Sequence, residues 1–410
     1  MLITNIKTLF GVREEPKFLR GKEMASLPAI DNAFLLVKGE EIMGYGTMDQ
    51  LDLRRFSDQE DIIDASGQFV LPAWCDSHTH LVFAGSRESE FVDKIKGLSY
   101  AEIAQKGGGI LNSAALLRDT DEDDLFQQSW RRLEAVRAMG TGAIEIKSGY
   151  GLSVEAELKI LRVVKRLKEK SPLHIKATFL GAHAYPLEYK DDHQAYVDLV
   201  CNEMLPKVAE EGLASYVDVF FEKGFFDAKA SKQVMDAAQK YGLKGKLHAN
   251  QLSNSGGVQF GVENGLLSVD HLETMGVEEI KALLGSETIP TLLPSAAFFL
   301  RMAYPPAREM IDAGLGVALA TDFNPGSSPS GNIPLLIALS CIQMKMTPEE
   351  AINAVTINGA HAMEVQEELG SVTVGKKANL IFTKPMSSLA YLPYSFGENL
   401  IDKVMIRGQF

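Results

Sequence analysis

The chain has 410 residues, 46% hydrophobic and 23% charged, which suits one large folded unit with an accessory domain. Its 41 basic and 54 acidic residues give a net charge of −13, which argues against nucleic acids or anionic membranes as partners. Without a signal-like leader or an apolar run of membrane-spanning length, and with three widely spaced cysteines, the sequence predicts a cytoplasmic protein with reduced thiols.

Both ends of the chain differ in style from its middle. Residues 1–68 and 366–410 contain short β-like segments separated by glycine turns. The region between them does not have this pattern. We therefore predict that the two ends associate as one small composite β-sandwich domain. The remaining residues, 69–365, would form a second and larger domain.

Strand-like and helix-like segments alternate through this larger domain. The strand-like segments cover 67–78, 142–149, 174–183, 216–224, 245–251, 266–273, 288–295 and 316–323. Most are apolar until their C-terminal ends, as expected for parallel strands buried on both faces. This α/β pattern predicts a (β/α)₈ TIM-like barrel. A doubly wound open sheet is the competing fold, but the glycine-rich stretch 106–113 does not match a dinucleotide fingerprint and is predicted to be a loop.

Polar residues able to bind a metal stand at the C-terminal ends of several predicted strands. His78 and His80 follow the first strand and, being two residues apart, project from the same side. Other strand ends carry His183, His248, His271 and Asp322. Each alone is equally well explained as a hydrogen-bonded polar residue. Together they predict a zinc or iron site at the rim where barrel enzymes place their chemistry.

The histidines of H-T-H at 78–80, followed in order by His248, His271 and Asp322, resemble the motif set of the amidohydrolase superfamily. The stretches FAGSRESEF, IEIKSGYGL, TFLGAHAYP, HANQLSNSGG and ATDFNPGSSPS extend the resemblance over essentially the whole chain. The resemblance implies that one zinc or iron ion is bound by His78, His80, His248 and Asp322 and activates a water. His271, Asp322 and His183 are the implied catalytic residues, and either His271 or Asp322 would be the general base.

The resemblance also implies a small-molecule substrate with a carboxylate tail. The expected reaction is hydrolysis of a cyclic amide C–N bond, opening 4-imidazolone-5-propanoate to N-formimidoyl-L-glutamate in histidine degradation. Arg87 would bind the propanoate through its guanidinium fork, although a salt bridge to a neighbouring glutamate would equally explain this residue. The other implied substrate contacts are Tyr150, His183, Gln251, Asn324, Gly326 and Ser327. A homodimer is implied as well.

Two alternative functions share these residues. A mononuclear purine or pyrimidine deaminase would use the same ligands, but it usually has a glutamate where Gln251 stands. A metal-free barrel retained for binding would tend to lose one or more ligands. Lys147 raises a separate question, because some superfamily members bridge two metals with a carboxylated lysine. Since Lys147 comes earlier in the strand order than that lysine does, we predict a single ion.

Overall fold

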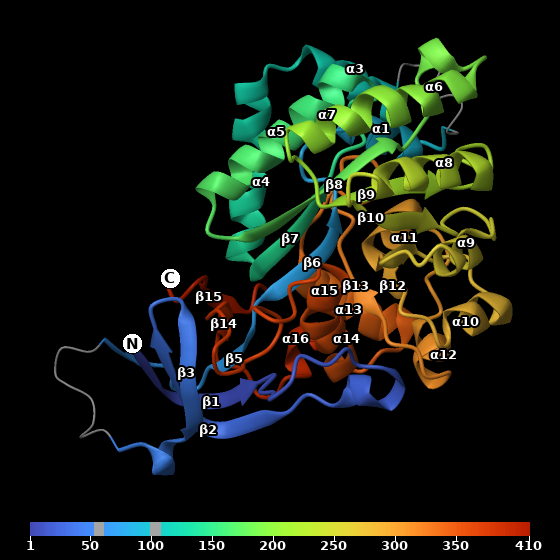
Figure 1. Ribbon diagram of the computed structural model, residues 1–410. Helices are drawn as coiled ribbons and strands as arrows, with labels where there is room; N and C mark the ends of the chain where they lie inside the picture. Colours follow the sequence, from blue (N-terminus) through green and yellow to red (C-terminus); the bar gives the residue numbers. More distant parts are fainter. Residues whose placement is uncertain (53–60, 99–107) are drawn as a thin grey trace.

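The computed structural model describes residues 1–52, 61–98 and 108–410. Its central feature is an eight-stranded parallel sheet (Figure 1). Each strand of this sheet pairs with the strand that follows it along the chain. In chain order these strands are β6 (Trp74–Thr79), β7 (Thr141–Lys147), β8 (His174–Ala182), β9 (Tyr216–Phe221), β10 (Lys244–Ala249), β11 (Ser268–His271), β12 (Ile289–Leu292) and β13 (Ala318–Leu319). A parallel bridge between Thr79 and Phe323 joins the first strand to the last, so the predicted barrel is confirmed.

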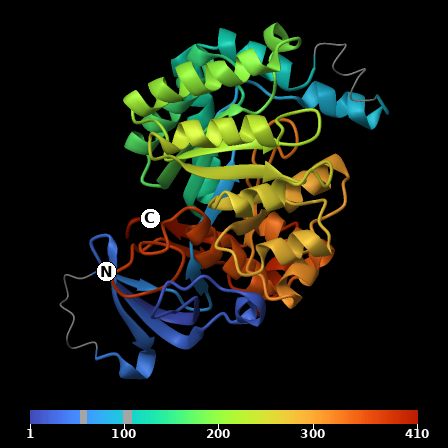
Figure 2. The same ribbon diagram turned by 45° about the vertical axis from the view of Figure 1, so that its right-hand side comes forward.

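Helices surround this barrel (Figure 2). Their buried apolar residues form continuous clusters with those of the strands. Those before β10 are α1 (Glu88–Ile95), α3 (Ile110–Asp119), α4 (Glu122–Ala138), α5 (Val154–Lys170), α6 (His193–Leu199), α7 (Leu205–Glu210) and α8 (Ala228–Gln239). Those after it are α9 (Gly257–Glu263), α10 (Val277–Leu283), α11 (Pro294–Leu300), α12 (Ala307–Asp312), α13 (Ile333–Met344), α14 (Pro348–Val355), α15 (Ile357–Ala362) and α16 (Tyr391–Tyr394). Within the described ranges, none has the length and apolarity needed to cross a bilayer.

Local sequence explains where the helices begin. The Asp121 side chain accepts a hydrogen bond from the Asp123 amide and caps α4, whose first turn carries the acidic residues Glu122, Asp123 and Asp124. The loop predicted for 106–113 is wrong from Ile110 onward, because Ala114 and Leu117 make one side of α3 apolar and bury it. Residues 106 and 107 lie outside the described residues.

A second sheet brings the two ends of the chain together, as predicted. Its strands are β1 (Leu2–Phe10), β2 (Ala29–Lys38), β3 (Glu41–Thr47), β4 (Ile62–Asp64), β5 (Phe69–Pro72), β14 (Leu380–Thr383) and β15 (Ile401–Met405). Strand β5 pairs with β1 on one side and with β14 on the other, which joins the N-terminal and C-terminal segments (Figure 1). The chain thus crosses from this sheet to the barrel between Pro72 and Trp74, whereas the division at residue 69 stays a prediction.

Trp74 lies at this crossing and is fully buried, and its Nε1 donates to the Met139 carbonyl over 3.0 Å. We expect Trp74→Ala to lower the free energy of unfolding by about 3–5 kcal/mol, because the barrel cannot collapse around so large a void. Denaturant unfolding followed by circular dichroism measures this change. Trp130→Ala, on a half-buried site of α4, is the matched control with a smaller expected loss. A loss below about 1 kcal/mol for Trp74→Ala would show that this crossing is not tightly packed.

Candidate metal centre

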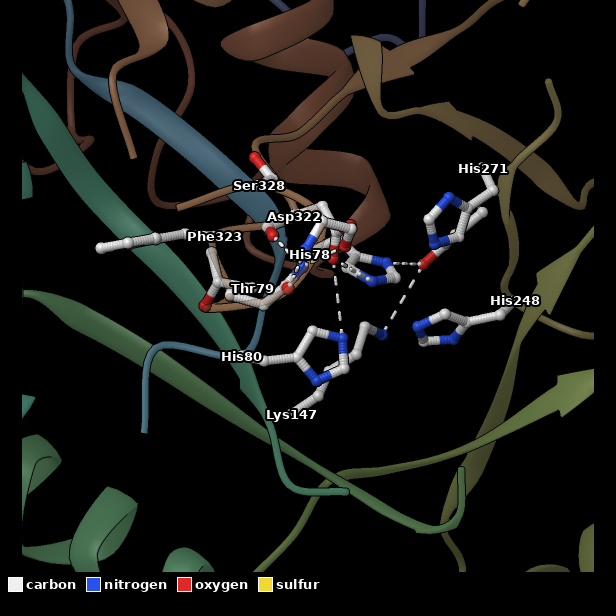
Figure 3. Close-up of polar contacts among 12 residues, drawn as sticks. His78, Thr79, His80, Lys147, His248, His271, Asp322, Phe323 and Ser328 are labelled. Carbon is white, nitrogen blue, oxygen red and sulfur yellow. Dashed lines mark hydrogen bonds and ion pairs between the residues drawn. The ribbon is translucent and has the colours of Figure 1, made fainter. Parts of the chain in front are cut away.

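The predicted ligands come together at the C-terminal ends of the barrel strands. Figure 3 shows His78 and His80, at the end of β6, pointing toward His248 at the end of β10 and Asp322 after β13. Asp322 Oδ1 lies 3.6 Å from His78 Nε2 and 3.7 Å from His80 Nε2. The His78 and His248 rings have centroids 4.5 Å apart. Three side chains, those of His78, His80 and Asp322, therefore present ligand atoms within 4.8 Å of one another.

Hydrogen bonds on the far side of each ring direct the Nε2 atoms inward. His78 Nδ1 donates to Asp270 Oδ2 over 2.6 Å, and His248 Nδ1 donates to Asp218 Oδ1 over 3.1 Å. His80 Nδ1 donates to the Ser148 carbonyl over 3.2 Å. These bonds leave the Nε2 lone pairs for a ligand, as is usual for metal-binding histidines.

Two of these inward-facing nitrogens provide a test of whether a metal fits. His78 Nε2 and His248 Nε2 are buried and have no hydrogen-bond partner among the residues that the structure describes. Buried polar atoms without a partner are costly in free energy, so such atoms call for a ligand. Burial, together with the charge of Lys147, keeps the pKa of His78 well below its ordinary value. Burial and the neighbouring His183 do the same for the pKa of His80, so both rings are neutral, as a metal requires.

His271 lies beside this cluster but has a different environment. Its ring centroid is 5.2 Å from that of His248, and its Nδ1 lies 3.2 Å from Glu273 Oε1. Burial opposes the charged imidazole, but Glu273 outweighs it and raises the pKa of His271. The backbone has positive φ at two residues of this site, 87° at His271 and 53° at Asp322. Positive φ in residues other than glycine is uncommon and concentrates at functional sites.

The turn after β13 is organised around one amide side chain. Asn324 Oδ1 accepts from the backbone amides of Gly326 and Ser327, both over 2.8 Å, and from the Tyr150 hydroxyl over 3.3 Å. The Ser327 hydroxyl donates to Asp322 Oδ2 over 3.1 Å. Hence this turn holds Asp322 through Oδ2, the oxygen opposite the one that faces His78 and His80. Gly326 and Ser327 were predicted to contact substrate, and their backbone amides are hydrogen-bonded within the turn itself.

Three further predicted residues line the same end of the barrel. The His183 ring stacks on that of His80 with centroids 5.3 Å apart, and Tyr150 meets both rings edge-on. His183 Nδ1 donates to the Gly149 carbonyl over 2.9 Å, and burial lowers the pKa of His183 to about 3. The neutral ring therefore keeps Nε2 as an acceptor. Gln251, two residues beyond β10, is also buried.

Arg87 stands at the start of α1 and makes the salt bridge that was its alternative explanation. Its Nε and Nη2 donate to Glu90 Oε2 over 2.9 and 2.5 Å, and the pair is largely buried. A Cβ at Gly326 would lie 2.3 Å from Arg87 Nη1, so the guanidinium packs directly against the Asn324 turn. Arg87 also lines a cavity of about 580 Å³ with Phe323 and Pro325. Only two of its five N–H donors serve Glu90, which leaves the Nη1 side available.

Sequence reasoning missed the charged layer beneath the ligands. Its members have no exposed surface and are Glu145, Lys147, Asp218, Lys246 and Asp270. Asp218 and Asp270 are the acceptors for two ligand histidines, yet each sits inside an apolar strand and not at its end. Their position inside apolar strands could have indicated this layer from the sequence, because a carboxylate buried within a strand needs a charged or hydrogen-bonding partner.

A protein-family model described as the amidohydrolase family matches residues 69–410, and the chain belongs to that family. Two curated relatives are named imidazolonepropionase and are each 56% identical to it. The relative from Christiangramia forsetii aligns over 410 residues, which are 100% of this chain and 99% of the relative. The one from Flavobacterium johnsoniae aligns over 409 residues with the same coverage. A solved 5-methylcytosine deaminase from Klebsiella pneumoniae has a TM-score of 0.75 over 100% of this chain and 97% of its own, but its 16% identity speaks to fold alone.

Proposed function

We propose that this chain is a metal-dependent hydrolase that opens the ring of 4-imidazolone-5-propanoate to give N-formimidoyl-L-glutamate, the imidazolonepropionase reaction of histidine degradation. Identity of 56% along the whole length of two relatives of that name supports this activity over the alternatives. The observation that carries the chemistry is the convergence of His78 Nε2 and His80 Nε2 on Asp322 Oδ1. The likeness to a deaminase is one of fold only.

The residues that would hold one zinc or iron ion are His78, His80 and His248 through Nε2, and Asp322 through Oδ1. Three neutral imidazoles and one carboxylate leave the ion with residual positive charge, which suits either metal. When bound, such an ion supplies the Lewis acidity that makes hydroxide available from water near neutral pH. The protein's own contribution is to hold the four donors at the rim.

Hydrolysis of the ring amide needs two proton movements. One proton must leave the attacking water, and one must reach the ring nitrogen when the C–N bond breaks. Asp322 and His271 are the groups in reach, and Glu273 holds the His271 ring with Nδ1 engaged. Because Glu273 raises its pKa, His271 is suited to donate a proton or to polarise the carbonyl oxygen. Either residue can accept the proton of the water.

Substrate orientation would come from the residues on either side of these groups. His183 offers Nε2 as an acceptor for a ring N–H, and Gln251 offers an amide that reads either a donor or an acceptor. Arg87 would bind the propanoate at Nη1, beside Gly326. Tyr150, Asn324 and Ser327 would form the wall between Arg87 and the reacting carbonyl.

The direct test is an absorbance assay of ring opening with purified protein and 4-imidazolone-5-propanoate. Cytosine and adenine serve as deaminase substrates in parallel. We expect turnover of the imidazolone only. Turnover of either base with release of ammonia, and none of the imidazolone, would overturn the proposal.

Removal of the metal gives a further prediction. Prolonged dialysis against a chelator is expected to abolish ring opening while circular dichroism stays unchanged, because the barrel core is independent of the ligand layer. About one equivalent of zinc or iron should restore activity. Full activity in protein that elemental analysis shows to be metal-free would contradict the proposed centre.

The remaining proposals concern the protein as a whole. We expect a homodimer, which sedimentation equilibrium of the full chain tests directly. A cytoplasmic location stays a prediction, and so does a partner list restricted to the small-molecule substrate.

A further inference from the structure

The layer beneath the proposed metal centre contains several buried charged side chains that packing alone does not require. Three carboxylates and two ammonium groups lie there without any exposed surface, in Glu145, Lys147, Asp218, Lys246 and Asp270. Burying charges costs free energy that apolar side chains of similar size would not cost. The two lysines of this layer hold different partners.

Lys147 contacts both carboxylates that support ligand histidines. Its Nζ lies 2.8 Å from Asp218 Oδ2 and 3.6 Å from Asp270 Oδ2. The other oxygen of Asp218 accepts from His248 Nδ1, and the same oxygen of Asp270 accepts from His78 Nδ1. One ammonium group is thus linked through one carboxylate to each of two ligand rings. Figure 3 shows Lys147 lying beneath His78 and His248.

The same place has the make-up of a second cation site. His78, Asp218 and Asp270 offer ligand atoms within 4.8 Å of one another. The Lys147 ammonium already lies against both carboxylates of that group, and it also pairs with Glu145 Oε1 at 2.7 Å. A carboxylated Lys147 would instead place an anion against three carboxylates, which electrostatics opposes.

We propose that the Lys147 ammonium is an internal cation that replaces a second metal ion and positions Asp218 and Asp270, so that His248 and His78 direct Nε2 at the single metal. Lys147 is in this account a positioning residue and touches neither substrate nor metal. Burial opposes its charge, but Asp218, Glu145 and Asp270 together raise the pKa of Lys147, so the ammonium persists. The inference rests on the proposed metal centre.

Lys246 is a matched control within the same layer. It is equally buried and carries the same charge, but its ammonium pairs with Glu145 and reaches the Ser77 carbonyl over 3.4 Å. No ion pair between Lys246 and Asp218 or Asp270 occurs in the described part of the chain. Lys147→Met and Lys246→Met therefore remove the same charge at the same depth, and only the first releases the two supporting carboxylates.

The experiment measures the Kd for Zn²⁺ of the full chain by competition with a chromophoric chelator, in the wild type and both variants. We expect Lys147→Met to weaken zinc binding by about 10–100-fold, the usual cost of losing support for metal ligands. We expect Lys246→Met to weaken zinc binding clearly less than Lys147→Met does, because Lys246 forms an ion pair with neither supporting carboxylate and acts on Asp270 only at longer range. Equal Kd values for the two variants, or a wild-type Kd in Lys147→Met, would overturn the inference.

Two further outcomes are kept distinct. Should Lys147→Met not fold, Lys147→Gln takes its place, and failure of both while Lys246→Met folds would show that Lys147 serves barrel folding instead. Wild-type protein that binds zinc but does not open the imidazolone ring would contradict the proposed function and leave this inference standing.

Discussion

Replacing His78 with alanine is expected to reduce kcat/KM for ring opening by at least about 10³-fold, the largest loss among the substitutions considered. His78 Nε2 is a buried nitrogen without a hydrogen-bond partner among the described residues. Its removal takes away one of the two imidazole nitrogens, His78 Nε2 and His80 Nε2, that lie 3.6 and 3.7 Å from Asp322 Oδ1. Without a firmly held ion, the pKa of the attacking water returns from about 7 to the far higher value of bulk water. The loss should therefore appear in kcat together with the metal content, which elemental analysis measures.

The matched control is His193→Ala, which removes a histidine from the exposed start of α6, where its ring stacks on Tyr185. This variant should keep both metal content and kcat/KM. A His78→Ala protein that retains one equivalent of metal and near wild-type turnover would refute the assignment of His78 as a ligand.

Replacing Arg87 with alanine should raise KM for 4-imidazolone-5-propanoate by about 10–100-fold, the equivalent of one charged hydrogen bond of about 1.5–3 kcal/mol. The guanidinium gives its Nε and Nη2 to Glu90 and keeps Nη1 against Gly326, so it is held in place before any substrate binds. Because the carboxylate tail is remote from the reacting bond, kcat should change by less than about threefold. Steady-state kinetics of wild type and variant separate the two constants.

A cyclic imidazolone without the propanoate tail provides the control for this second prediction. If Arg87 binds the tail, wild type and Arg87→Ala should act on the truncated compound with the same kcat/KM. Arg87→Lys keeps the charge but lacks the fork, so its KM should lie between the other two. An unchanged KM for the full substrate in Arg87→Ala would rule out the carboxylate clamp.

Sequence reasoning could place the proposed metal ligands at one rim because strand geometry is regular. Parallel strands of a barrel end at one rim, and alternate residues share a side, so His78, His80, His248 and Asp322 could be placed together without coordinates. The structure brings ligand atoms of His78, His80 and Asp322 within 4.8 Å of one another and places the His248 ring 4.5 Å from that of His78. The composite β domain was predictable for a similar reason, since both chain ends share short β-like segments that need a partner sheet edge.

Other parts of the site depend on distances across the barrel, which a sequence does not contain. Asp218 and Asp270 lie in strands β9 and β11, and only the closed barrel brings both to the ammonium of Lys147. The turn after Asp322 is another such case. Gly326 and Ser327 stay predicted substrate contacts, but the hydrogen bonds that their backbone amides donate to Asn324 Oδ1 could not be read from the sequence, because the Asn324 side chain folds back over the turn.

The central claim is that three histidines and one aspartate hold a single cation above the Lys147 ammonium. An anomalous difference map, collected at the metal absorption edge from crystals of the purified protein, tests it most directly. We predict one peak per chain, surrounded by His78, His80, His248 and Asp322. A peak between Asp218 and Asp270, or no peak among the four predicted ligands in metal-loaded protein, would contradict the account.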